Sequence, residues 1–365
     1  MENDMIYYLL ALQSVDGIGC MGARKLIEHF GSPKAVLSAE ERQLLEVEGI
    51  GPKLAKNLKA ESIYRKAGLE LEIIQKYRLN WVSFLDLEYP EQLRHCEDAP
   101  LLLFYKGKLD LGKRRIISVV GTRKMTSHGA TFMKRLFSEL EKYDPVIVSG
   151  LAYGVDIQAH RLALQHGLKT IGVLAHGLDR IYPRAHYKTA LSMLEQGALL
   201  TEFRTGTPPE RENFVKRNRI IAGMSEATLV IESSGKGGSL ITADLASSYH
   251  REVFAVPGRS SDPFSVGCNH LIKTHRASML THAGDLAYML NWEPVRECSK
   301  RTEDFVSLDA REKELLDAIQ KHGKIQADHL SQICKLPIKD VLSSLLRLEL
   351  YGRIRELPGK HYEVS

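Results

Sequence analysis

A glycine cluster that holds one lysine is a candidate phosphate-binding loop. Residues 230–243 have the sequence VIESSGKGGSLITA, in which an apolar run ends at the cluster and a helix-like stretch follows. The first amides of a helix bind anions because they have no partner within the helix and lie at its positive end. The cluster does not match the nucleotide-hydrolysing P-loop, because its lysine precedes a glycine rather than Ser or Thr. We therefore expect an anion-binding helix start without hydrolytic machinery, formed by Lys236, Gly238, Ser239 as the N-cap, and Thr242.

A second segment, ERENFVKRNRIIAGMSEA at residues 210–227, concentrates four basic residues around one aromatic ring. This interleaving is typical of single-strand platforms, in which charges follow the phosphates while a ring stacks on a base. The alternative is an ordinary solvated basic face of a helix. The expected binding residues are Phe214, Lys216, Arg217, Asn218 and Arg219.

Apolar spacing predicts how this segment is oriented if it is helical. Ile220, Ile221 and Met224 define a buried side. At about 100° per residue Arg217 points toward that side, which predicts a structural or crevice role for it. Arg219 then points away from the buried side and, like the lysine at 216, is expected as an outer contact.

The sequence GTRKMTSHG, residues 121–129, follows another apolar run and offers a second anion-binding turn. Gly121 allows a phosphate to approach the backbone, and Thr122, Arg123 and Lys124 supply a hydroxyl group and two positive charges. The second and third glycines of the dinucleotide fingerprint are missing, so a nicotinamide or flavin dinucleotide is not expected. A solvated turn remains the alternative.

A third loop lies in SGLAYGVDIQAHRLAL, where Ser149, Gly150 and Gly154 precede a helix-like stretch. Asp156 and His160 are four residues apart, so they share a helix face and could form an acid–base pair. No nucleophile accompanies them. We favour structural roles, in which the aspartate steadies the loop and the histidine packs as a neutral polar group.

The loops above follow strand-length apolar runs, which predict the element that positions them. The runs between residues 115 and 290 are RIISVVG, PVIVSG, TIGVLAHG, ALLTE, ATLVIE, EVFAVPG and the short ASMLT, with room for helices between them. Such continuous runs predict parallel strands covered on both faces, and hence a doubly wound α/β sheet. Ligands bind these sheets beyond the carboxyl ends of the strands, where the candidate loops lie.

The first 65 residues contain a near-repeat. Val15–Phe30 and Val47–Leu58 share the pattern V-x-G-I-G-x-x-x-A-x-x-L, which resembles tandem helix-hairpin-helix motifs that hold nucleic-acid phosphates without reading sequence. A pair of ordinary helical hairpins is the alternative. Residues 66–114 are expected to be a connector with a strand at Asn80–Leu85.

The C-terminal residues 305–365 predict three helices followed by a β ribbon, the pattern of a winged helix. The third helix offers only Lys339 and Arg347 as basic residues, so protein docking or a structural role stays as open as DNA contact. The predicted domains are 1–65, a connector at 66–114, 115–295 and 305–365.

Composition limits the possible classes of protein. A formal net charge of +5 over 365 residues, with 44% hydrophobic residues, permits but does not require a polyanion partner. Five cysteines are scattered singly, so we expect no disulfide framework, no metal and no cofactor. The N-terminus MENDMIYYLLALQSVDG lacks the basic residues of a signal peptide and is too short to span a bilayer, so a cytoplasmic protein without membrane partners is expected.

Seven ordered motifs resemble the DprA family, also called Smf, the DNA-processing proteins of bacterial natural transformation. They are VVGTRKMTSHG, SGLAYGVDIQAH, TIGVLAHGLDRIYPRAH, TEFRTGTPP, NFVKRNRIIAGMSEATLVIES, GGSLITADLA and REVFAVPG. The resemblance implies a Rossmann-like domain that binds and protects single-stranded DNA, forms a homodimer and helps load RecA recombinase, without enzymatic turnover. It implies DNA contacts by the candidate residues of all four segments above.

This chain departs from the family pattern at three positions. The family commonly has Pro and Arg where this chain has Val215 and Lys216, and often Asn where it has His186. A lysine keeps the positive charge but loses the bidentate fork of arginine. The dimer face stays open between the apolar stretch LLLFYKG and surfaces near Met279–Leu290.

Two rival interpretations remain at the level of the sequence. One is a nucleotide-binding or nucleotide-hydrolysing enzyme related to phosphoribohydrolases, in which Glu202 acts on a ribose, Arg219 holds the phosphate and Asp244 supplies an acid. The other is a structural adaptor whose pocket no longer binds a ligand.

Overall fold

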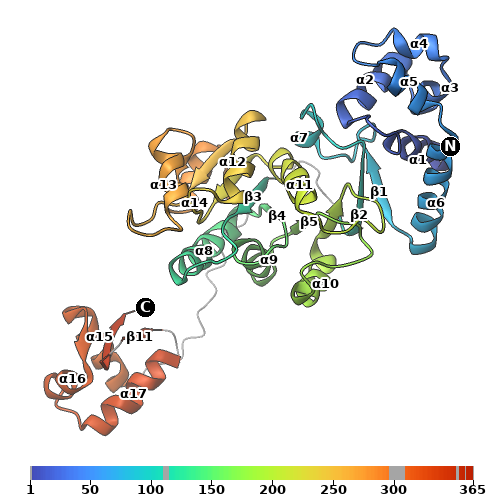
Figure 1. Ribbon diagram of the computed structural model, residues 1–365. Helices are drawn as coiled ribbons and strands as arrows, with labels where there is room; N and C mark the ends of the chain where they lie inside the picture. Colours follow the sequence, from blue (N-terminus) through green and yellow to red (C-terminus); the bar gives the residue numbers. More distant parts are fainter. Residues whose placement is uncertain (1, 110–114, 296–308, 351–352, 358, 365) are drawn as a thin grey trace. The chain divides into compact units, whose positions relative to one another are not determined.

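The structure is a computed structural model that divides into two compact units, Met1–Glu297 and Cys298–Ser365. It describes residues 2–109, 115–295, 309–350, 353–357 and 359–364. The first unit holds the N-terminal helices and the large sheet, and the second holds the C-terminal helices (Figure 1). Cys298 and the predicted domain start at residue 305 lie outside the described residues.

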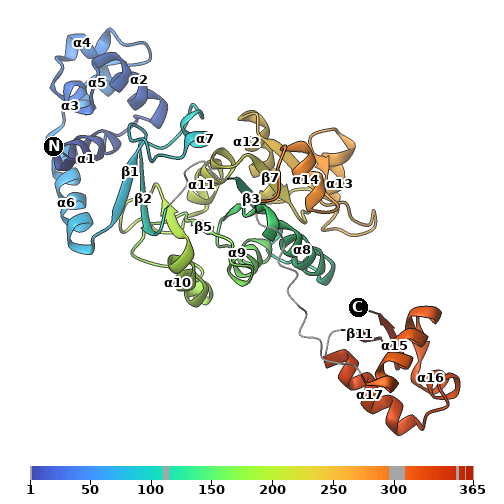
Figure 2. The ribbon, with the colours of Figure 1, turned by 180° about the vertical axis from the view of Figure 1, so that it is seen from behind.

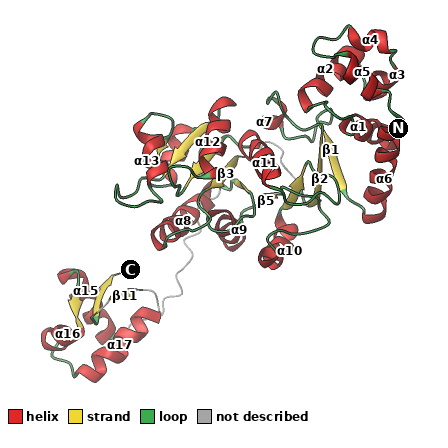
Figure 3. Ribbon diagram, viewed as in Figure 1, coloured by secondary structure: helices red, strands yellow, loops and turns green. Residues whose placement is uncertain are grey.

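A nine-stranded sheet forms the centre of the first unit and is drawn in yellow in Figure 3. Its strands are β1 (Asn80–Ser83), β2 (Leu102–Gly107), β3 (Ile116–Val120), β4 (Val146–Ser149), β5 (Thr170–Val173), β6 (Ala198–Thr201), β7 (Ala227–Val230), β8 (Glu252–Ala255) and β9 (Ser278–Met279). Their order is β1-β2-β6-β5-β4-β3-β7-β8-β9. All pairs from β6 to β9 are parallel, whereas β2 pairs antiparallel with β1 and β6. The predicted doubly wound, mostly parallel α/β sheet is confirmed.

Helices cover both faces of this sheet (Figures 1 and 2). They are α8 (Ser127–Leu140) with the 3-10 turn η1 (Glu141–Tyr143), α9 (Val155–Gln165), η2 (Arg184–His186), α10 (Tyr187–Gln196), α11 (Arg211–Met224), α12 (Gly238–Ser248), α13 (Val266–Lys273) and α14 (Ala283–Met289). Ile117 and Val119 of β3 belong to one hydrophobic cluster with side chains of α8, α9 and α14. Ile116 and Val120 belong to another with α11, α12 and α13. This two-sided burial explains why the strand sequences are continuous apolar runs.

The N-terminal helices contain the repeated turn predicted from the sequence. They are α1 (Glu2–Gln13), α2 (Cys20–Phe30), α3 (Pro33–Ser38), α4 (Glu41–Leu45), α5 (Pro52–Leu58) and α6 (Glu61–Tyr77). Gly17 and Gly49 have φ angles of +90° and +89°, a backbone conformation that favours glycine. Gly19 and Gly51 are the N-caps of α2 and α5 with nearly identical dihedral angles. The sequence repeat is therefore a structural repeat.

The predicted connector is part of the sheet rather than a separate spacer. Its first residues, 66–77, belong to α6, so the connector expected from residue 66 begins inside a helix. Besides β1 and β2 it contributes the short helix α7 (Glu91–Arg94). The stretch LLLFYKG, which the sequence leaves open as an interface, contains β2, and its residues Leu102, Leu103 and Phe104 are buried. Because β2 pairs with strands on both sides, it is a core strand and not a free apolar surface.

The N-terminal helices are tied to the rest of the first unit by long-range hydrogen bonds. The backbone amide of Thr205 donates to the buried carboxylate of Glu70 in α6 at 3.0 Å. The guanidinium of Arg24 in α2 donates to the backbone oxygen of Cys96 at 2.8 Å. These hydrogen bonds pair polar groups of the N-terminal helices with polar groups of the sheet region. Buried apolar residues of both regions also belong to one hydrophobic cluster.

The second unit has the winged-helix arrangement expected from the sequence. Its elements are α15 (Ala310–His322), β10 (Ile325–Gln326), α16 (Ala327–Ile333), α17 (Ile338–Leu350), β11 (Ile354–Leu357) and β12 (His361–Val364). The strands form a small sheet in the order β10-β12-β11, and Leu315, Leu330 and Leu345 lie in a separate core. None of the described helices in either unit has the length and apolar character needed to cross a membrane.

Candidate nucleic-acid interface

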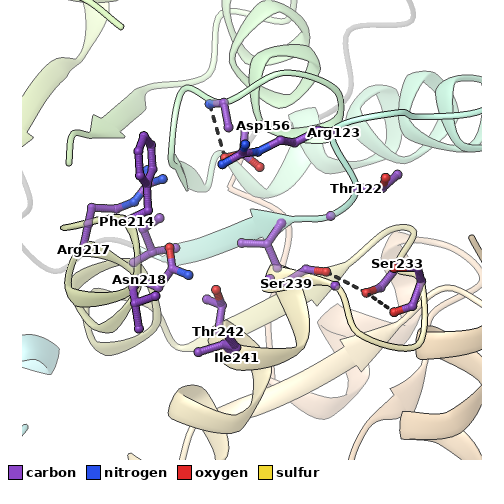
Figure 4. Close-up of a pocket in the computed structure, with 18 of the residues that line it drawn as sticks. Thr122, Arg123, Asp156, Phe214, Arg217, Asn218, Ser233, Ser239, Ile241 and Thr242 are labelled. Carbon is purple, nitrogen blue, oxygen red and sulfur yellow. Dashed lines mark hydrogen bonds between the residues drawn. The ribbon is translucent and has the colours of Figure 1, made fainter. Parts of the chain in front are cut away.

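A pocket lies where the chain changes direction in the sheet (Figure 4). From β3 the chain proceeds outward through β4, β5 and β6, then crosses back to β7 on the other side of β3. The loops after β3 and β7 therefore diverge, which opens a crevice beyond the strand ends. Together with α11 and α12 these loops enclose about 420 Å³, which we call the switch-point pocket.

The switch-point pocket brings together residues from all four segments singled out in the sequence, with Ala152 and Asp156 coming from the loop after β4 and the helix that follows it. The predicted residues that line it are Gly121, Thr122, Arg123, Phe214, Arg217, Asn218, Lys236, Gly238, Ser239 and Thr242. The predicted residues that do not line it are Lys124, Ser149, Gly150, Gly154, Lys216 and Arg219. Lys124 and Lys216 are exposed.

The charges that line the pocket are unbalanced. Arg123, Arg211, Arg217 and Lys236 face a single carboxylate, that of Asp156. Within the described part of the chain, Arg123, Arg211 and Lys236 have no ion-pair partner. Because the walls exclude part of the solvent, the excess of positive charge favours an anionic ligand.

Arg217 forms the buried floor of the pocket. Its side chain is nearly inaccessible, and its Nη1 donates to the backbone oxygen of Val173 at 2.7 Å. Burial lowers the pKa of Arg217 to about 10, although the negative charge of Asp156 opposes this shift. The guanidinium therefore stays charged at neutral pH. The prediction that Arg217 turns toward the buried side of its helix is confirmed.

The ring of Phe214 makes cation–π contacts with two of the pocket arginines. The guanidinium carbon of Arg123 lies 5.6 Å from the centre of the Phe214 ring, and that of Arg217 lies 5.8 Å from it. The ring of Tyr182 approaches from another side, 6.1 Å away and inclined by 60°. The half-buried ring thus holds the two cations near each other, which offsets part of their repulsion.

The first turn of α12 forms the opposite wall. The N-cap is Gly237, so the prediction that Ser239 caps the helix is wrong. Ser239 is the second helical residue, and its hydroxyl donates to Ser233 Oγ at 2.9 Å. A Cβ at Gly237 would lie 2.4 Å from that same Ser233 oxygen, so only glycine fits there. The glycine cluster does lead into a helix start, whose first amides have no acceptor within the helix. That these amides bind an anion stays a prediction.

The predicted residues of the loop after β4 support the pocket from behind. A Cβ at Gly150 would lie 1.9 Å from Arg217 Nη1, so the missing side chain makes room for the guanidinium. Gly154 has φ of +76°, and a Cβ there would lie 2.2 Å from the backbone oxygen of Thr122. Ser149 is buried and its hydroxyl donates to Val119 O at 2.7 Å. These residues shape the pocket without lining it.

Arg219 does not have the outer position expected from the helical pattern. Its Nη2 donates to the carboxylate of Glu202, which follows β6, and lies 3.8 Å from Cys20 Sγ at the start of α2. Both side chains of the ion pair are largely buried. Apolar spacing indicates which side of a helix is buried in its own sheet, but it does not reveal that a second region covers another side.

This ion pair bears on the enzyme alternative. Glu202 and Arg219 bond to each other outside the pocket, and Asp244 forms an ion pair with Arg276 on the surface. None of the residues assigned to a phosphoribohydrolase-like reaction lines the switch-point pocket. No observation favours that reaction here.

Asp156 and His160, the possible acid–base pair, each bond to a different neighbour and have separate structural roles. Thr170 Oγ1 donates to Ile147 O at 3.0 Å, so it accepts the hydrogen bond from His160 Nδ1 at 2.7 Å. Burial lowers the pKa of His160 to about 3. Asp156 accepts a bond from the Ala152 amide at 3.4 Å, and burial raises its pKa while Arg217 opposes the rise. The histidine is a neutral packing residue.

Sequence reasoning missed several residues that line the pocket. Ser233 and Ser234 precede the glycine cluster, and Arg211 begins α11. The signal was present, since all three are polar residues inside the quoted segments, but their local spacing matched no motif. Among the described residues no group of three or more His, Cys, Asp and Glu side chains could hold a metal ion.

The fold and the pocket define a doubly wound α/β protein with a cation-lined pocket at its switch point, whose chain also contains tandem hairpins and a winged helix. The family model for DNA recombination-mediator protein A matches residues 80–291, so the chain belongs to this family. The model of a SAM-like helix-hairpin-helix tandem matches residues 9–62, and that of the DprA winged helix domain matches residues 301–360.

Individual relatives agree with this assignment. Protein Smf of Synechocystis is 31% identical over an alignment of 398 residues that covers all of both chains. DNA processing protein DprA of Streptococcus pneumoniae is 43% identical over 204 residues, which cover 56% of this chain and 72% of that protein.

Two solved structures are similar to this chain. DprA of Streptococcus pneumoniae has a TM-score of 0.68 and 34% identity, covering 80% of this chain and 99% of that one. DNA processing protein A of Helicobacter pylori has a TM-score of 0.53 and 28% identity, covering 59% of this chain and 98% of that one. The latter structure concerns that protein's single-stranded DNA binding mode.

Proposed function

We propose that this protein binds single-stranded DNA without sequence preference in the switch-point pocket. As a homodimer it would protect the strand and help load RecA recombinase onto it during transformation and recombination. The observation that carries the proposal is the pocket lining of four cations against one carboxylate, next to the free amides of a helix start. A phosphate backbone fits both features, because each phosphate needs charge and hydrogen-bond donors.

The proposal also commits to a binding protein rather than an enzyme. Arg217 is fixed by Val173 and by the glycine behind it, so its charge is preorganised for a bound anion. Glu202 and Asp244, the carboxylates assigned to a phosphoribohydrolase-like reaction, are paired outside the pocket. The Helicobacter pylori relative, whose structure concerns single-stranded DNA binding, supports the choice of ligand.

The test is a salt titration of fluorescent oligo-dT binding by wild type and by Arg123→Ala. The logarithm of the affinity should fall linearly with the logarithm of salt concentration, by about 0.7 for each phosphate neutralised. The variant should bind more weakly and lose about 0.7 from that slope. Lys124→Ala is the matched control, because Lys124 is an exposed neighbour that does not line the pocket.

Two results would contradict the proposed function. Duplex DNA bound as tightly as single strand would move the site to the terminal regions. Equal losses in the Arg123→Ala and Lys124→Ala proteins would show that the pocket makes no specific contribution. RecA filament formation on strands coated with single-strand-binding protein tests the loading step, which should require the pocket arginines.

A further inference from the structure

Phe214 has little free surface for a base. Two guanidinium groups lie within 6 Å of its centre and the ring of Tyr182 contacts it edge to face. Phe214 is also the one aromatic residue among the described residues that line the pocket. The pocket therefore offers a bound strand several cations for its phosphates but no free aromatic face on which its bases could stack.

Two exposed tyrosines lie in loops next to the switch-point pocket, outside its lining. Tyr182 lies in the loop after β5 with 49% of its surface exposed, and its ring centre is 6.1 Å from that of Phe214. Tyr153 lies in the loop after β4 and is also 49% exposed. An exposed tyrosine offers a flat apolar face at little conformational cost, as a stacking surface requires.

The two tyrosines are held by one turn. Tyr182 and the following proline lead directly into η2, whose last residue is His186. The ring of Tyr153 contacts the His186 ring edge to face at 4.8 Å. His186 is itself buried, and its Nδ1 lies 2.8 Å from the backbone oxygen of Leu151. Tyr153 therefore rests on a fixed group, and the rings of 182 and 153 flank the same rigid turn.

Positive charge accompanies the rings. Arg184 within η2 and Lys188 in the first turn of α10 are exposed, and within the described ranges neither side chain has an ion-pair partner. The neighbouring Arg180 is instead paired with Asp179 at 2.7 Å. Two free cations beside two exposed rings match a nucleic-acid strand better than an apolar protein surface.

We propose that a single strand leaving the switch-point pocket continues across the carboxyl ends of β4 and β5, where Tyr182 and Tyr153 stack on its bases. This inference rests on the proposed function and adds the direction of the strand and its base contacts. The two residues together are the tyrosine path. Because β4 and β5 follow β3 in the sheet, the path extends away from β7.

The experiment measures the affinity of oligo-dT of increasing length for the full-length protein. The variants are Tyr182→Ala, Tyr153→Ala and Tyr182→Phe, with Tyr77→Ala as the control because Tyr77 is 59% exposed at the end of α6. Each alanine variant should bind long oligomers about 5- to 150-fold more weakly, the range expected for one stacked base. The shortest oligomers that bind should be unaffected. Tyr182→Phe and Tyr77→Ala should behave as wild type.

Other outcomes overturn the tyrosine path. Equal losses at every length would mean that the tyrosines only hold the pocket together. Normal binding of all lengths with impaired RecA loading would make these rings a protein-docking surface. Loss in Tyr182→Phe as large as in Tyr182→Ala would assign the effect to the hydroxyl group instead of the ring. Wild type that binds no single strand would refute the proposed function, and the path with it.

Discussion

Arg217 is a buried cation whose position is fixed by its neighbours. Its guanidinium occupies the space that the missing side chain of Gly150 leaves, donates to Val173 O, and lies near the carboxylate of Asp156. Taking a charge out of water is costly unless it gains partners, and Val173 O and the negative charge of Asp156 offset part of that cost. The Nε atom of Arg217 has no hydrogen-bond partner in the described protein.

The first residue-scale prediction concerns Gly150→Ala. The added Cβ would lie 1.9 Å from Arg217 Nη1, so the guanidinium must leave its place. Gly150 does not have a positive φ, so backbone strain is not the cause of the expected effect. Affinity for oligo-dT should fall about 10- to 100-fold, the value of one hydrogen bond to a charged group.

The control is Gly235→Ala, where the nearest atom to the new Cβ is Val266 Cγ1 at 3.5 Å, an ordinary contact. This variant should bind as wild type. A Gly150→Ala protein that keeps full affinity would show that the exact position of the Arg217 guanidinium is unimportant.

The second residue-scale prediction concerns pH. His160 has a pKa of about 3 in the folded protein and about 6.5 when unfolded, so below pH 6.5 the unfolded chain takes up a proton that the folded one does not. Folding stability should therefore decrease as pH falls, by about 1.4 kcal/mol per pH unit between roughly pH 6 and pH 4 from this group.

Urea unfolding of wild type and His160→Gln at several pH values isolates this contribution, because the other titrating groups are shared. The stability difference between the two proteins should change in favour of the variant as pH falls. A difference independent of pH would mean that His160 is protonated in the folded state or does not titrate in this range.

At the scale of elements, α11 connects the switch-point pocket to the N-terminal helices. One side of α11 carries Phe214 and Arg217 into the pocket, and another carries Arg219 to Glu202 beside α2. Gln13 of α1 also donates to the backbone oxygen of Glu202 at 3.2 Å. The N-terminal helices therefore brace the helix that carries two of the four pocket cations, Arg211 and Arg217.

The corresponding prediction separates bracing from DNA contact. Glu202→Gln leaves the buried Arg219 charge without its anionic partner and should lower the free energy of unfolding by about 3–5 kcal/mol. The double substitution Glu202→Leu with Arg219→Met removes both charges and should recover most of that loss. Urea unfolding measures both effects.

The folded double variant should bind oligo-dT as wild type does, because neither residue lines the pocket. If it folds normally but loses strand binding, Arg219 contacts DNA directly, as the sequence pattern alone suggests, and the bracing role is wrong.

At the scale of the whole molecule, the two compact units have separate cores. The winged helix is built on its own cluster, which includes Leu315 and Leu345, and shares no buried residue with the clusters of the first unit. On α17 the exposed side chains include Ile338, Leu342 and Leu346, and Arg347 forms ion pairs with acidic residues of the same unit. Little free positive charge remains on that helix for DNA.

Truncation after residue 297 tests this assignment. The remaining unit should keep its unfolding midpoint, its oligo-dT affinity and its salt slope, because the pocket and its supports are all within it. A truncated protein with a salt slope smaller by one phosphate or more would place DNA contacts on the winged helix.

Much of the site is predictable because it depends on local patterns. The apolar runs ending in glycine specify strands followed by tight turns, and the spacing of Ile220, Ile221 and Met224 specifies which side of α11 receives Arg217. The positive φ values of Gly17 and Gly49 follow from a repeated motif in which only glycine is free of strain. The prediction from local pattern was wrong where two nearby residues are both suitable N-caps, since Gly237 rather than Ser239 caps α12.

What the sequence determined by itself is therefore the strands, their turns and the family to which the motifs belong. The tertiary structure alone decided that the loops after β3 and β7 line one pocket, that Arg219 pairs with Glu202, and that Tyr182 lies against Phe214. These contacts join residues far apart in the chain. Their formation depends on strand order and on the packing of separate regions, which hydrophobic periodicity does not encode.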